Sequence, residues 1–364
     1  MKILIAPDKF KGSLTGLEVI EAIKQGIKSF DENIEIETQL LADGGEGTLE
    51  VLEQSLDVER IELSVAGPIS KSTNAYYLLQ GEVAYIEMAQ ASGLLLLPMK
   101  DRNPLYTSTF GTGQMILDAM DKGVKSINLF VGGSATNDCG LGMAKALGFQ
   151  FYDANDKELE GRGEELGQVV KIDLDNVDDR IADINFKVLT DVQNPLLGDN
   201  GAAHVYGPQK GATVNIVDRL EQGAKHLVSV MSNDKENVSG AGAAGGLGYG
   251  ALSFLNAEIQ SGIEFLMEVT SLESKVKQVD LVITGEGSID HQTLEGKVIA
   301  GLYELCKNLK VPMAVLCGRS NLDSFSKALI YQIMDKAKST EDAMENAIAY
   351  LSELTQQLLS DFRA

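Results

Sequence analysis

Residues 2–27 read KILIAPDKFKGSLTGLEVIEAIKQGI and carry the signals of a strand, a loop and a helix in that order. Residues 2–6 are a short, mostly apolar run with β-branched members, and Pro7 interrupts it. After the loop, apolar side chains recur at helical spacing, at Leu14, Leu17, Ile20, Ile23 and Ile27. This order predicts a strand followed by an amphipathic helix that packs on a sheet.

The first residue of this helix is left open by the sequence. Thr15 and Glu18 have the spacing of a capping box, in which each side chain satisfies a backbone N–H of the other. Ser13 is an equally suitable N-cap, because its hydroxyl can accept the same kind of hydrogen bond. The helix is therefore expected to begin just after one of these two residues.

The order of strand, loop and helix recurs at both ends of the chain. Near the start, IEIETQLL leads through the glycine-rich turn ADGGEGT into TLEVLEQSL. The last hundred residues alternate in the same way, and a final helix is expected to bury Met344, Ile348, Leu351, Leu354 and Leu358. Between them, RIELSVAG, TNAYYLLQ and EVAYIEMA are short alternating runs typical of antiparallel strands.

These patterns of strands and helices predict an α/β fold in which the first domain is built from two separate segments of the chain. Residues 1–62 and 270–364 are expected to form a Rossmann-like parallel-sheet domain from both chain ends. Residues 63–269 are expected to form a second, inserted α/β domain. The active site is expected in the cleft between the two domains, and the sequence does not fix whether the protein forms a homo-oligomer.

Composition narrows the classes of partner. The chain has 364 residues, of which 44% are hydrophobic, and 53 acidic against 31 basic residues give a formal net charge of −22. Such a surface offers no general electrostatic attraction to nucleic acid or an anionic membrane, so small molecules are the expected partners. No apolar run approaches the roughly 18 residues of a membrane span, and there is no signal-peptide pattern. The three scattered cysteines and three histidines favour no zinc site or disulfide framework, and a cytoplasmic location is expected.

The stretch VGGSATND, residues 131–138, follows an apolar strand and contains hardly a bulky side chain. A glycine-rich turn between a strand and a helix exposes backbone N–H groups at the positive end of the helix dipole, where phosphate binds. Asp138 is a candidate ligand of Mg²⁺, directly or through water. The alternative is a tight turn whose small residues only allow close packing. The phosphate-binding candidates are Gly132, Gly133, Ser134, Thr136 and Asn137.

Acidic residues follow several of the expected strands. LADGGEGT contains Asp43 and Glu46, and ITGEGSID contains Glu286 and Asp290. Carboxylates at strand ends are typical of a metal-assisted site, since Mg²⁺ binds few carboxylates and keeps substrate oxygens. Asp191 ends the expected strand FKVLTD, where it either accepts a hydroxyl proton or forms an Asx-turn that stops the strand.

Other motifs fail the tests of their context. GAGAAG, residues 240–245, matches the dinucleotide pattern but follows no strand, so it is interpreted as a loop or helix-packing segment. There is no P-loop motif and no GxSxG elbow near a histidine. Two alternative functions remain to be tested. One is an NAD-dependent dehydrogenase that uses GAGAAG despite the missing strand, and the other is a non-catalytic sugar-acid binding protein.

Nine motifs occur in one order along the chain: APDKFKGSL, LADGGEGT, IEMAQASGL, NPLYTSTFGTGQ, VGGSATNDCGLG, DVQNPLLG, GAAHVYGPQKGA, GAGAAGGLG and VITGEGSIDHQT. Together they make the sequence resemble the bacterial glycerate kinases of the type-I family. The resemblance implies ATP-dependent phosphorylation of D-glycerate, with Mg²⁺ as cofactor, in a cleft between a Rossmann-like and a second α/β domain. It implies 2-phospho-D-glycerate as the usual product, with 3-phospho-D-glycerate as the alternative.

The resemblance also implies roles for single residues. Asp191 is the candidate catalytic base or metal ligand, Lys11 the candidate contact to a phosphate or carboxylate, and the loop from Gly132 to Asp138 the candidate site for the phosphates of ATP. Lys9 and Ser288 depart from the family, which commonly has serine and arginine there, so neither inherits a role. The substrate-binding candidates that line the cleft are Asp8, Asp43, Glu46, Glu286 and Asp290. The candidate cations for the glycerate carboxylate are Lys11, Lys210 and Arg319.

Overall fold

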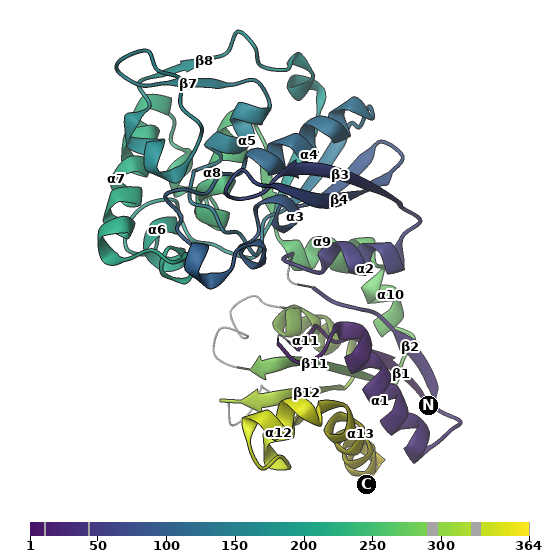
Figure 1. Ribbon diagram of the computed structural model, residues 1–364. Coiled ribbons are helices and arrows are strands. Elements are labelled where there is room, and N and C mark those ends of the chain that lie inside the picture. The colour runs from purple at the N-terminus through teal and green to yellow at the C-terminus, as the bar shows by residue number, and fades with distance from the viewer. Residues whose placement is uncertain (11, 43, 290–297, 322–328, 364) are drawn as a thin grey trace. The chain divides into compact units, whose positions relative to one another are not determined.

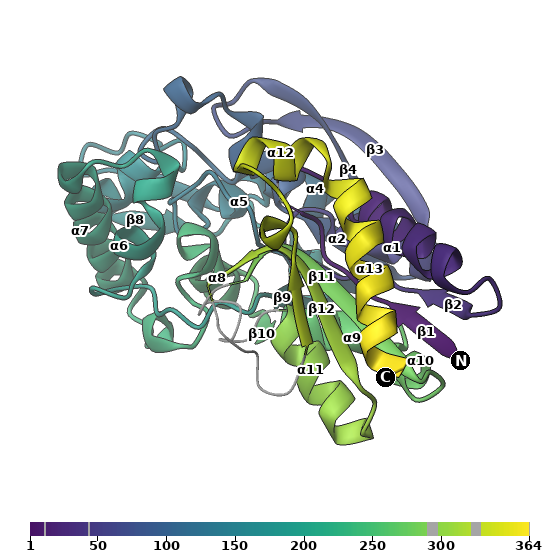
Figure 2. The same cartoon turned by 90° about the horizontal axis from the view of Figure 1, so that it is seen from below.

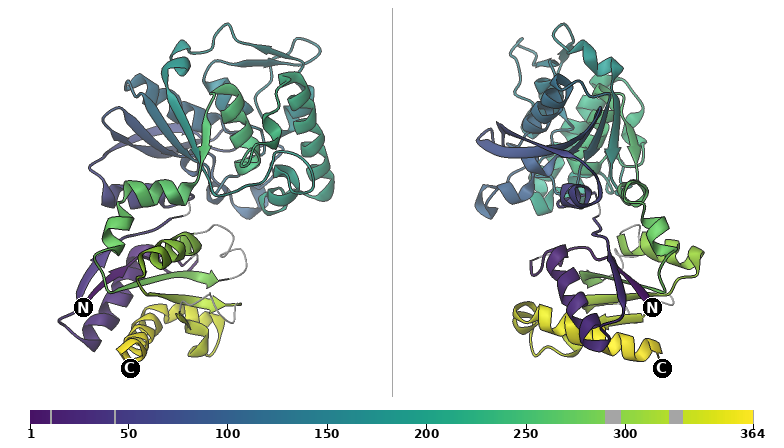
Figure 3. Two further views of the ribbon diagram at one scale, coloured as in Figure 1. Left: turned by 180° about the vertical axis from the view of Figure 1, so that it is seen from behind. Right: turned by 90° about the vertical axis from the view of Figure 1, so that its right-hand side faces the viewer.

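The computed structural model describes residues 1–10, 12–42, 44–289, 298–321 and 329–363, and the chain forms two compact units (Figure 1). Unit 1 consists of Met1–Asp43 and Ile263–Ala364, and unit 2 of Gly44–Gly262. Unit 1 thus contains both chain ends, as the two views of Figure 3 show. The predicted fold class, a parallel-sheet domain from both chain ends with an inserted α/β domain, is confirmed.

Unit 1 is built on a five-stranded parallel sheet in the order β13-β12-β11-β1-β2. In the central strand Ile3 lies between Leu281 and Ile36 on its two neighbours, and Leu4 and Val282 are buried. The strands are β1 (Lys2–Ile5), β2 (Glu35–Thr38), β11 (Leu281–Ile289), β12 (Met313–Ser320) and β13 (Leu329–Gln332).

Helices cover both faces of this sheet. The pair α1 and α13 lies side by side on one face, as Figure 2 shows from below, and α10 and α11 pack against the other face through buried Leu272, Val276 and Leu302. The helices of unit 1 are α1 (Gly16–Phe30), α9 (Gly262–Val269, whose first residue belongs to unit 2), α10 (Leu272–Val276), α11 (Val298–Leu309), α12 (Thr340–Glu345) and α13 (Ala347–Arg363), with a 3₁₀ turn η8 (Ile333–Asp335).

The start of α1 settles the alternative between the two N-caps. Thr15 is the N-cap: the Glu18 N–H donates to Thr15 Oγ1 over 3.2 Å, and the Thr15 N–H donates to Glu18 Oε2 over 2.8 Å. Ile20, Ile23 and Ile27 are buried as predicted. The prediction was wrong for Leu17, which is 51% exposed because the buried face of the helix continues through Val19 instead.

The C-terminal helical pattern is divided between two helices. Asn346 has non-helical φ and ψ and ends α12, and α13 begins at the next residue. Leu351, Leu354 and Leu358 are buried on α13, as predicted. Met344 and Ile348, at 45% and 43% exposed, are not, so the prediction of one continuous apolar stripe was wrong at its start. The break separates Met344 on α12 from the buried leucines on α13, whereas Ile348 is exposed in the first turn of α13 itself.

Unit 2 is built on a six-stranded mixed sheet in the order β10-β9-β6-β5-β4-β3. The pairs β3–β4 and β4–β5 are antiparallel, as the alternating runs predicted. The pairs β5–β6, β6–β9 and β9–β10 are parallel. The strands are β3 (Glu59–Ala66), β4 (Ser72–Gln80), β5 (Val83–Glu87), β6 (Ser126–Phe130), β9 (Asn185–Leu189) and β10 (Glu258–Gln260), and a separate hairpin joins β7 (Gln150–Tyr152) and β8 (Lys171–Asp173).

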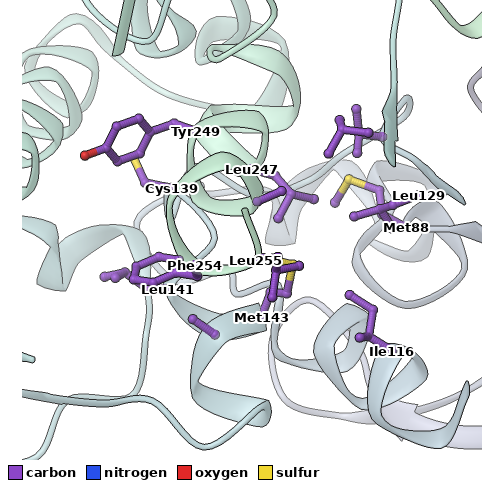
Figure 4. Close-up of a cluster of buried hydrophobic side chains, with 14 of the residues drawn as sticks. Met88, Ile116, Leu129, Cys139, Leu141, Met143, Leu247, Tyr249, Phe254 and Leu255 are labelled. Carbon is purple, nitrogen blue, oxygen red and sulfur yellow. The ribbon is translucent and has the colours of Figure 1, made fainter. Parts of the chain in front are cut away.

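The hydrophobic core of unit 2 lies between this sheet and its helices. Figure 4 shows part of it, where Leu129 of β6 and Met88 lie near side chains of α5 and α8, such as Met143 and Leu247. The helices are α2 (Thr48–Ser55), α3 (Ala89–Ser92), α4 (Phe110–Asp121), α5 (Leu141–Ala146), α6 (Ala202–Tyr206), α7 (Val214–Met231) and α8 (Ala243–Phe254), with a 3₁₀ turn η5 (Pro208–Lys210). None of the helices in the described ranges combines the length and the apolar character that crossing a membrane requires.

The boundaries between the units differ from those predicted at residues 62/63 and 269/270. The N-terminal segment of unit 1 ends at Asp43, because α2 packs against β4 and β5 of unit 2. The Thr48 N–H at the start of α2 donates to the buried Glu87 carboxylate over 3.2 Å, which fixes this helix to the sheet of unit 2. The second boundary lies at Gly262, directly after β10, so most of α9 belongs to unit 1.

Candidate functional site

The glycine-rich loop between β6 and α5 is mostly folded into unit 2. Gly133 is exposed and Gly132 half-buried, whereas Ser134, Thr136 and Asn137 are buried. Of the five predicted phosphate-binding residues, the first two therefore face outward in this conformation. The hydroxyl of Thr136 and the amide oxygen of Asn137 have no hydrogen-bond partner within the described residues.

Asp138 lies at the N-terminus of α5 and is fully buried. Its Oδ2 accepts hydrogen bonds from the N–H and the hydroxyl of Thr109, both over 2.7 Å, and from the Gly142 N–H, while Oδ1 accepts from the Gly140 N–H over 3.1 Å. Burial raises the pKa of this carboxyl, and the hydrogen bonds oppose that shift. The carboxyl group at this helix start is thus held by donors of the protein itself, and the role of Asp138 as a metal ligand stays a prediction.

Lys210 holds the same loop from the other side. This side chain from η5 is 1% exposed, and its Nζ donates to Ser134 Oγ over 2.8 Å and to the Thr136 carbonyl over 2.7 Å. Burial lowers the pKa of Lys210 to about 7, against the opposing effect of the Asp138 charge. In this conformation Lys210 therefore orders the loop, and its role as a cation for the glycerate carboxylate stays a prediction.

A second glycine-rich loop approaches the exposed part of the first. The Gly132 N–H donates to the Gly44 carbonyl over 3.4 Å, and a side chain on Gly132 would collide with the backbone of Gly45. A Cβ on Gly133 would lie 3.0 Å from Cγ and Oε1 of Glu46. The structure thus brings three predicted site residues together: Gly132, Gly133 and Glu46.

The GAGAAG segment packs against the inner side of the loop. Ala244, Gly245 and Gly246 all have positive φ, at 55°, 69° and 84°, and the Cys139 N–H donates to the Gly245 carbonyl over 3.2 Å. A side chain on Gly245 would collide with the Thr136 carbonyl. The interpretation as a packing segment is confirmed, and the observation that favoured a dinucleotide site is accounted for by this close approach.

Asp191 follows the end of β9, beside the strand that leads into the Gly132 loop. It is half-buried, and Ser261, which follows β10, donates from Oγ to Asp191 Oδ1 over 2.7 Å. This hydrogen bond orients the carboxylate at the carboxyl ends of the parallel strands, which is where ligands bind in open α/β sheets.

Unit 1 contains a pocket of about 480 Å³ at the carboxyl ends of β1, β11 and β12. Asp8 and Glu286, which the sequence predicted as substrate-binding, both line it, and so does Arg319. The Arg319 Nε donates to Ser288 Oγ over 3.2 Å. The remaining lining residues are Lys9, Phe10, Ser13, Gly287, Gly318, Ile333, Met334, Thr340, Ala343, Met344 and Ala347.

Several pocket residues had no role in the sequence analysis. Lys9 and Ser288 were set aside because they depart from the family, and Met344 was assigned to a helix core. Three other predicted site residues, Lys11, Asp43 and Asp290, lie outside the described residues. Within the described ranges, no group of three or more His, Cys, Asp or Glu side chains is placed to hold a metal ion.

Comparison with known proteins gives a consistent result. The model of the glycerate kinase family matches residues 3–363. A glycerate kinase of Halalkalibacterium halodurans is 40% identical over 98% of this chain and 97% of that protein, and a glycerate 2-kinase of Escherichia coli K12 is 41% identical over 87% of this chain and 85% of that protein. A crystal structure of a protein named as glycerate kinase 2 from Salmonella typhimurium LT2 has a TM-score of 0.83 and 38% identity, and covers 100% of this chain and 98% of that one. These matches confirm the resemblance seen in the sequence, and the chain therefore belongs to the glycerate kinase family.

Proposed function

We propose that this protein transfers the γ-phosphoryl group of ATP to D-glycerate and forms 2-phospho-D-glycerate. The family makes the chain a kinase, that is, a phosphotransferase. The observation that carries the finer proposal is the nearly full-length relation to a protein named glycerate 2-kinase. The 3-phosphate is the alternative product. The predicted position of the active site, in a cleft between the two domains, stays a prediction.

The arrangement of side chains fits the chemistry of phosphoryl transfer. That reaction asks the protein for positioning and charge neutralisation rather than covalent work. Asp191, oriented by the Ser261 hydroxyl, is proposed to accept the proton of the attacking glycerate hydroxyl. The backbone of the half-buried Gly132 and the exposed Gly133, beside Glu46, is proposed to approach the reacting phosphate, since neither residue has a side chain of its own in the way.

Mg²⁺ is proposed as the cofactor because the residues present fit it. Mg²⁺ binds through one or two protein carboxylates and completes its shell with phosphate oxygens and waters. Asp191 offers a half-buried, oriented carboxylate at a strand end, so it suits either a metal ligand or the base. When bound, the ion would neutralise charge on the phosphate oxygens.

A cytoplasmic location is part of the proposal. Cys139, Cys306 and Cys317 are all free and buried, so no disulfide stabilises the described fold. Free thiols are usual in proteins of the reducing cytoplasm.

The experiment that tests the proposal is ³¹P NMR of the purified protein with ATP, Mg²⁺ and D-glycerate. We expect a new phosphomonoester signal that is missing when glycerate is omitted. A doublet from coupling to one proton would identify the 2-phosphate, and a triplet from coupling to a CH₂ group the 3-phosphate. If a folded, ATP-hydrolysing preparation phosphorylated only other hydroxy acids, the glycerate assignment would be wrong while the kinase assignment stood.

A further inference from the structure

The pocket of unit 1 has an apolar side that glycerate does not need. Its apolar wall consists of Phe10, Ile333, Met334, Ala343, Met344 and Ala347. Phe10 and Ile333 are 3% and 1% exposed, so they are held in place, whereas Met344 keeps 45% of its surface open. Glycerate has three carbons, each bearing a hydroxyl or a carboxylate, and would leave such a wall unused. A purine base has two large apolar faces and would cover it.

The pocket also has polar lining residues, among them the carboxyl groups of Asp8 and Glu286 and two cationic side chains, Lys9 and Arg319, here called the cationic rim. Ser288 accepts a hydrogen bond from Arg319 Nε, which limits the directions in which the guanidinium can point. A planar guanidinium suits the oxygens of a phosphate group. Glu286 lines the same pocket and is a carboxylate of the kind that accepts hydrogen bonds from ribose hydroxyls in dinucleotide-binding domains.

The position of the pocket in the sheet favours a nucleotide as well. The chain leaves β1 for α1 on one face of the sheet and leaves β11 for α11 on the other, so the pocket lies where the direction of winding reverses. Ligands of open α/β sheets bind at this point, outside the carboxyl ends of the strands. A Cβ on Gly318 would lie 2.5 Å from the Gly287 carbonyl, so β11 and β12 approach closely there. Since both residues are glycines, neither fills the pocket with a side chain.

From these observations we infer that the unit 1 pocket binds the adenosine end of ATP, with the base on the apolar wall and the phosphates toward the cationic rim. The inference rests on the proposed function and assigns its nucleotide to a particular site. In unit 2, by contrast, the loop from Ser134 to Asp138 is buried against Lys210 and the GAGAAG segment.

The test compares two exposed apolar residues four positions apart. Met344 lines the pocket, whereas Ile348 does not, and the two are 45% and 43% exposed. We expect Met344→Asp to raise the Kd of the N-methylanthraniloyl derivative of ADP, followed by fluorescence titration, roughly tenfold or more, because a charge would replace the surface under the base. The control Ile348→Asp should change it by less than about twofold. Met344→Gln gives a second, uncharged variant if Met344→Asp lowers the circular dichroism signal.

Steady-state kinetics separate the base from the phosphates. Adenosine should inhibit competitively against ATP in the wild type, and Met344→Asp should weaken that inhibition. Arg319→Gln should weaken inhibition by tripolyphosphate and leave that by adenosine unchanged. In all variants the KM for D-glycerate should stay near the wild-type value.

The outcomes distinguish this inference from the proposed function. A Met344→Asp variant with a raised KM for glycerate and an unchanged KM for ATP would overturn the inference and give the pocket to the acceptor, with the kinase intact. Equal effects of Met344→Asp and Ile348→Asp on nucleotide binding would overturn it too. If the wild type did not phosphorylate glycerate, the proposed function would fail, and the fluorescence titration would still decide where ADP binds.

Discussion

Gly133 combines a backbone conformation that favours glycine with close contact to a predicted site residue. Its φ is +74°, and a side chain there would meet Glu46. We predict that Gly133→Val lowers kcat/KM for ATP by roughly 100-fold, because Glu46 must move and a shift of about 1 Å in a site costs that much. The fold should survive, with an unfolding free energy lower by about 1–3 kcal/mol.

Gly123→Val provides the matched control. Gly123 has a similar φ of +82°, but nothing lies within 4 Å of the added Cβ. This variant should show the same backbone strain and keep its activity. General unfolding of Gly133→Val in circular dichroism, with Gly123→Val folded, would make Gly133 a structural glycine instead.

The lowered pKa of Lys210 should make the unfolding free energy of the protein depend on pH. Its folded-state pKa is about 7, and the ordinary value of a lysine is 10.5. Between these values the unfolded chain binds the extra proton, so this residue makes the unfolding free energy rise with pH. We predict that the wild type gains stability over Lys210→Met as the pH is raised from about 7 toward 10, measured by urea unfolding.

Ser134→Ala is the control for that experiment. It removes one hydrogen bond of Lys210 but keeps the titrating amine, so its pH dependence should follow the wild type. A difference between wild type and Lys210→Met that stayed constant over this range would mean that the folded protein keeps Lys210 charged.

Asp191 is the residue on which the proposed chemistry depends most. We predict that Asp191→Asn lowers kcat by roughly 10²–10⁴-fold, because the amide cannot accept the hydroxyl proton. The half-buried position beside Ser261 makes the melting temperature insensitive by comparison. Asp199→Asn, on the exposed loop that follows, is the control and should behave as the wild type. Unchanged turnover by Asp191→Asn would remove Asp191 from the mechanism.

Residue types and strand ends were predictable, but the direction of the side chains was not. VGGSATND was correctly placed between a strand and a helix, since this depends on local pattern. That Asp138 turns inward depends on Thr109, which lies 29 positions earlier, and the burial of Ser134 and Thr136 depends on Lys210, more than 70 positions later. Such partners come together only in the folded chain, so short-range spacing alone could not show which side chains of this loop are buried.

At the scale of elements, α1 and α13 approach closely at a glycine. A Cβ on Gly26 would lie 2.5 Å from the Ser352 carbonyl and 2.6 Å from Thr355 Cβ. We predict that Gly26→Ala destabilises the protein by about 1–3 kcal/mol in urea unfolding, because the added methyl forces the helices apart. The gain in helix propensity, about 1 kcal/mol at most, does not offset this.

Gly301→Ala on α11 is the matched control. Its nearest neighbour is the terminal methyl group of Met267 at 3.1 Å, which can move aside. This variant should be as stable as the wild type or more stable. If Gly26→Ala were also neutral, the two helices would be able to separate at little cost.

The helix pattern predicted α1 well and the C-terminal helices only in part. Ile20, Ile23 and Ile27 follow one stripe because the helix is continuous through them. The pattern from Met344 to Leu358 has the same spacing, yet Asn346 ends the first helix, and an asparagine within a helix gives only a weak breaking signal. Apolar spacing therefore assigned Met344 to a core, whereas it lines a pocket.

At the scale of the whole molecule, the buried cluster of unit 2 consists, among the residues that the structure describes, of side chains from unit 2. Its buried cluster runs from Val65 to Ala257 along the chain. We predict that a fragment of residues 44–262 folds by itself and unfolds cooperatively in urea, as expected of a unit with its own core. A fragment of residues 63–262, which starts at the boundary predicted from the sequence, lacks α2 and should be less stable, since α2 packs on β4 and β5. Equal stability of the two fragments would contradict the observed boundary.

The discontinuous fold was predictable because strand–helix alternation at the two ends is a long, repeated pattern. The position of the first boundary was not, because α2 has the same local pattern as the elements of unit 1 that precede it. Only its packing on the sheet of unit 2, and the hydrogen bond from Thr48 to Glu87, assign it there.

The sheet of unit 1 has a consequence for the order in which the parts of the protein can fold during synthesis. Thr284 donates a hydrogen bond to the Ala6 carbonyl from 278 positions further along the chain. At about 5–20 residues per second, the ribosome needs roughly 15–55 s to deliver that partner after β1 has been synthesised. Unit 2 is complete in the meantime and can fold, while β1, α1 and β2 wait with the apolar face of α1 uncovered. The segment from β1 to β2, although synthesised before unit 2, thus reaches its final place in the sheet only after β11 has been made.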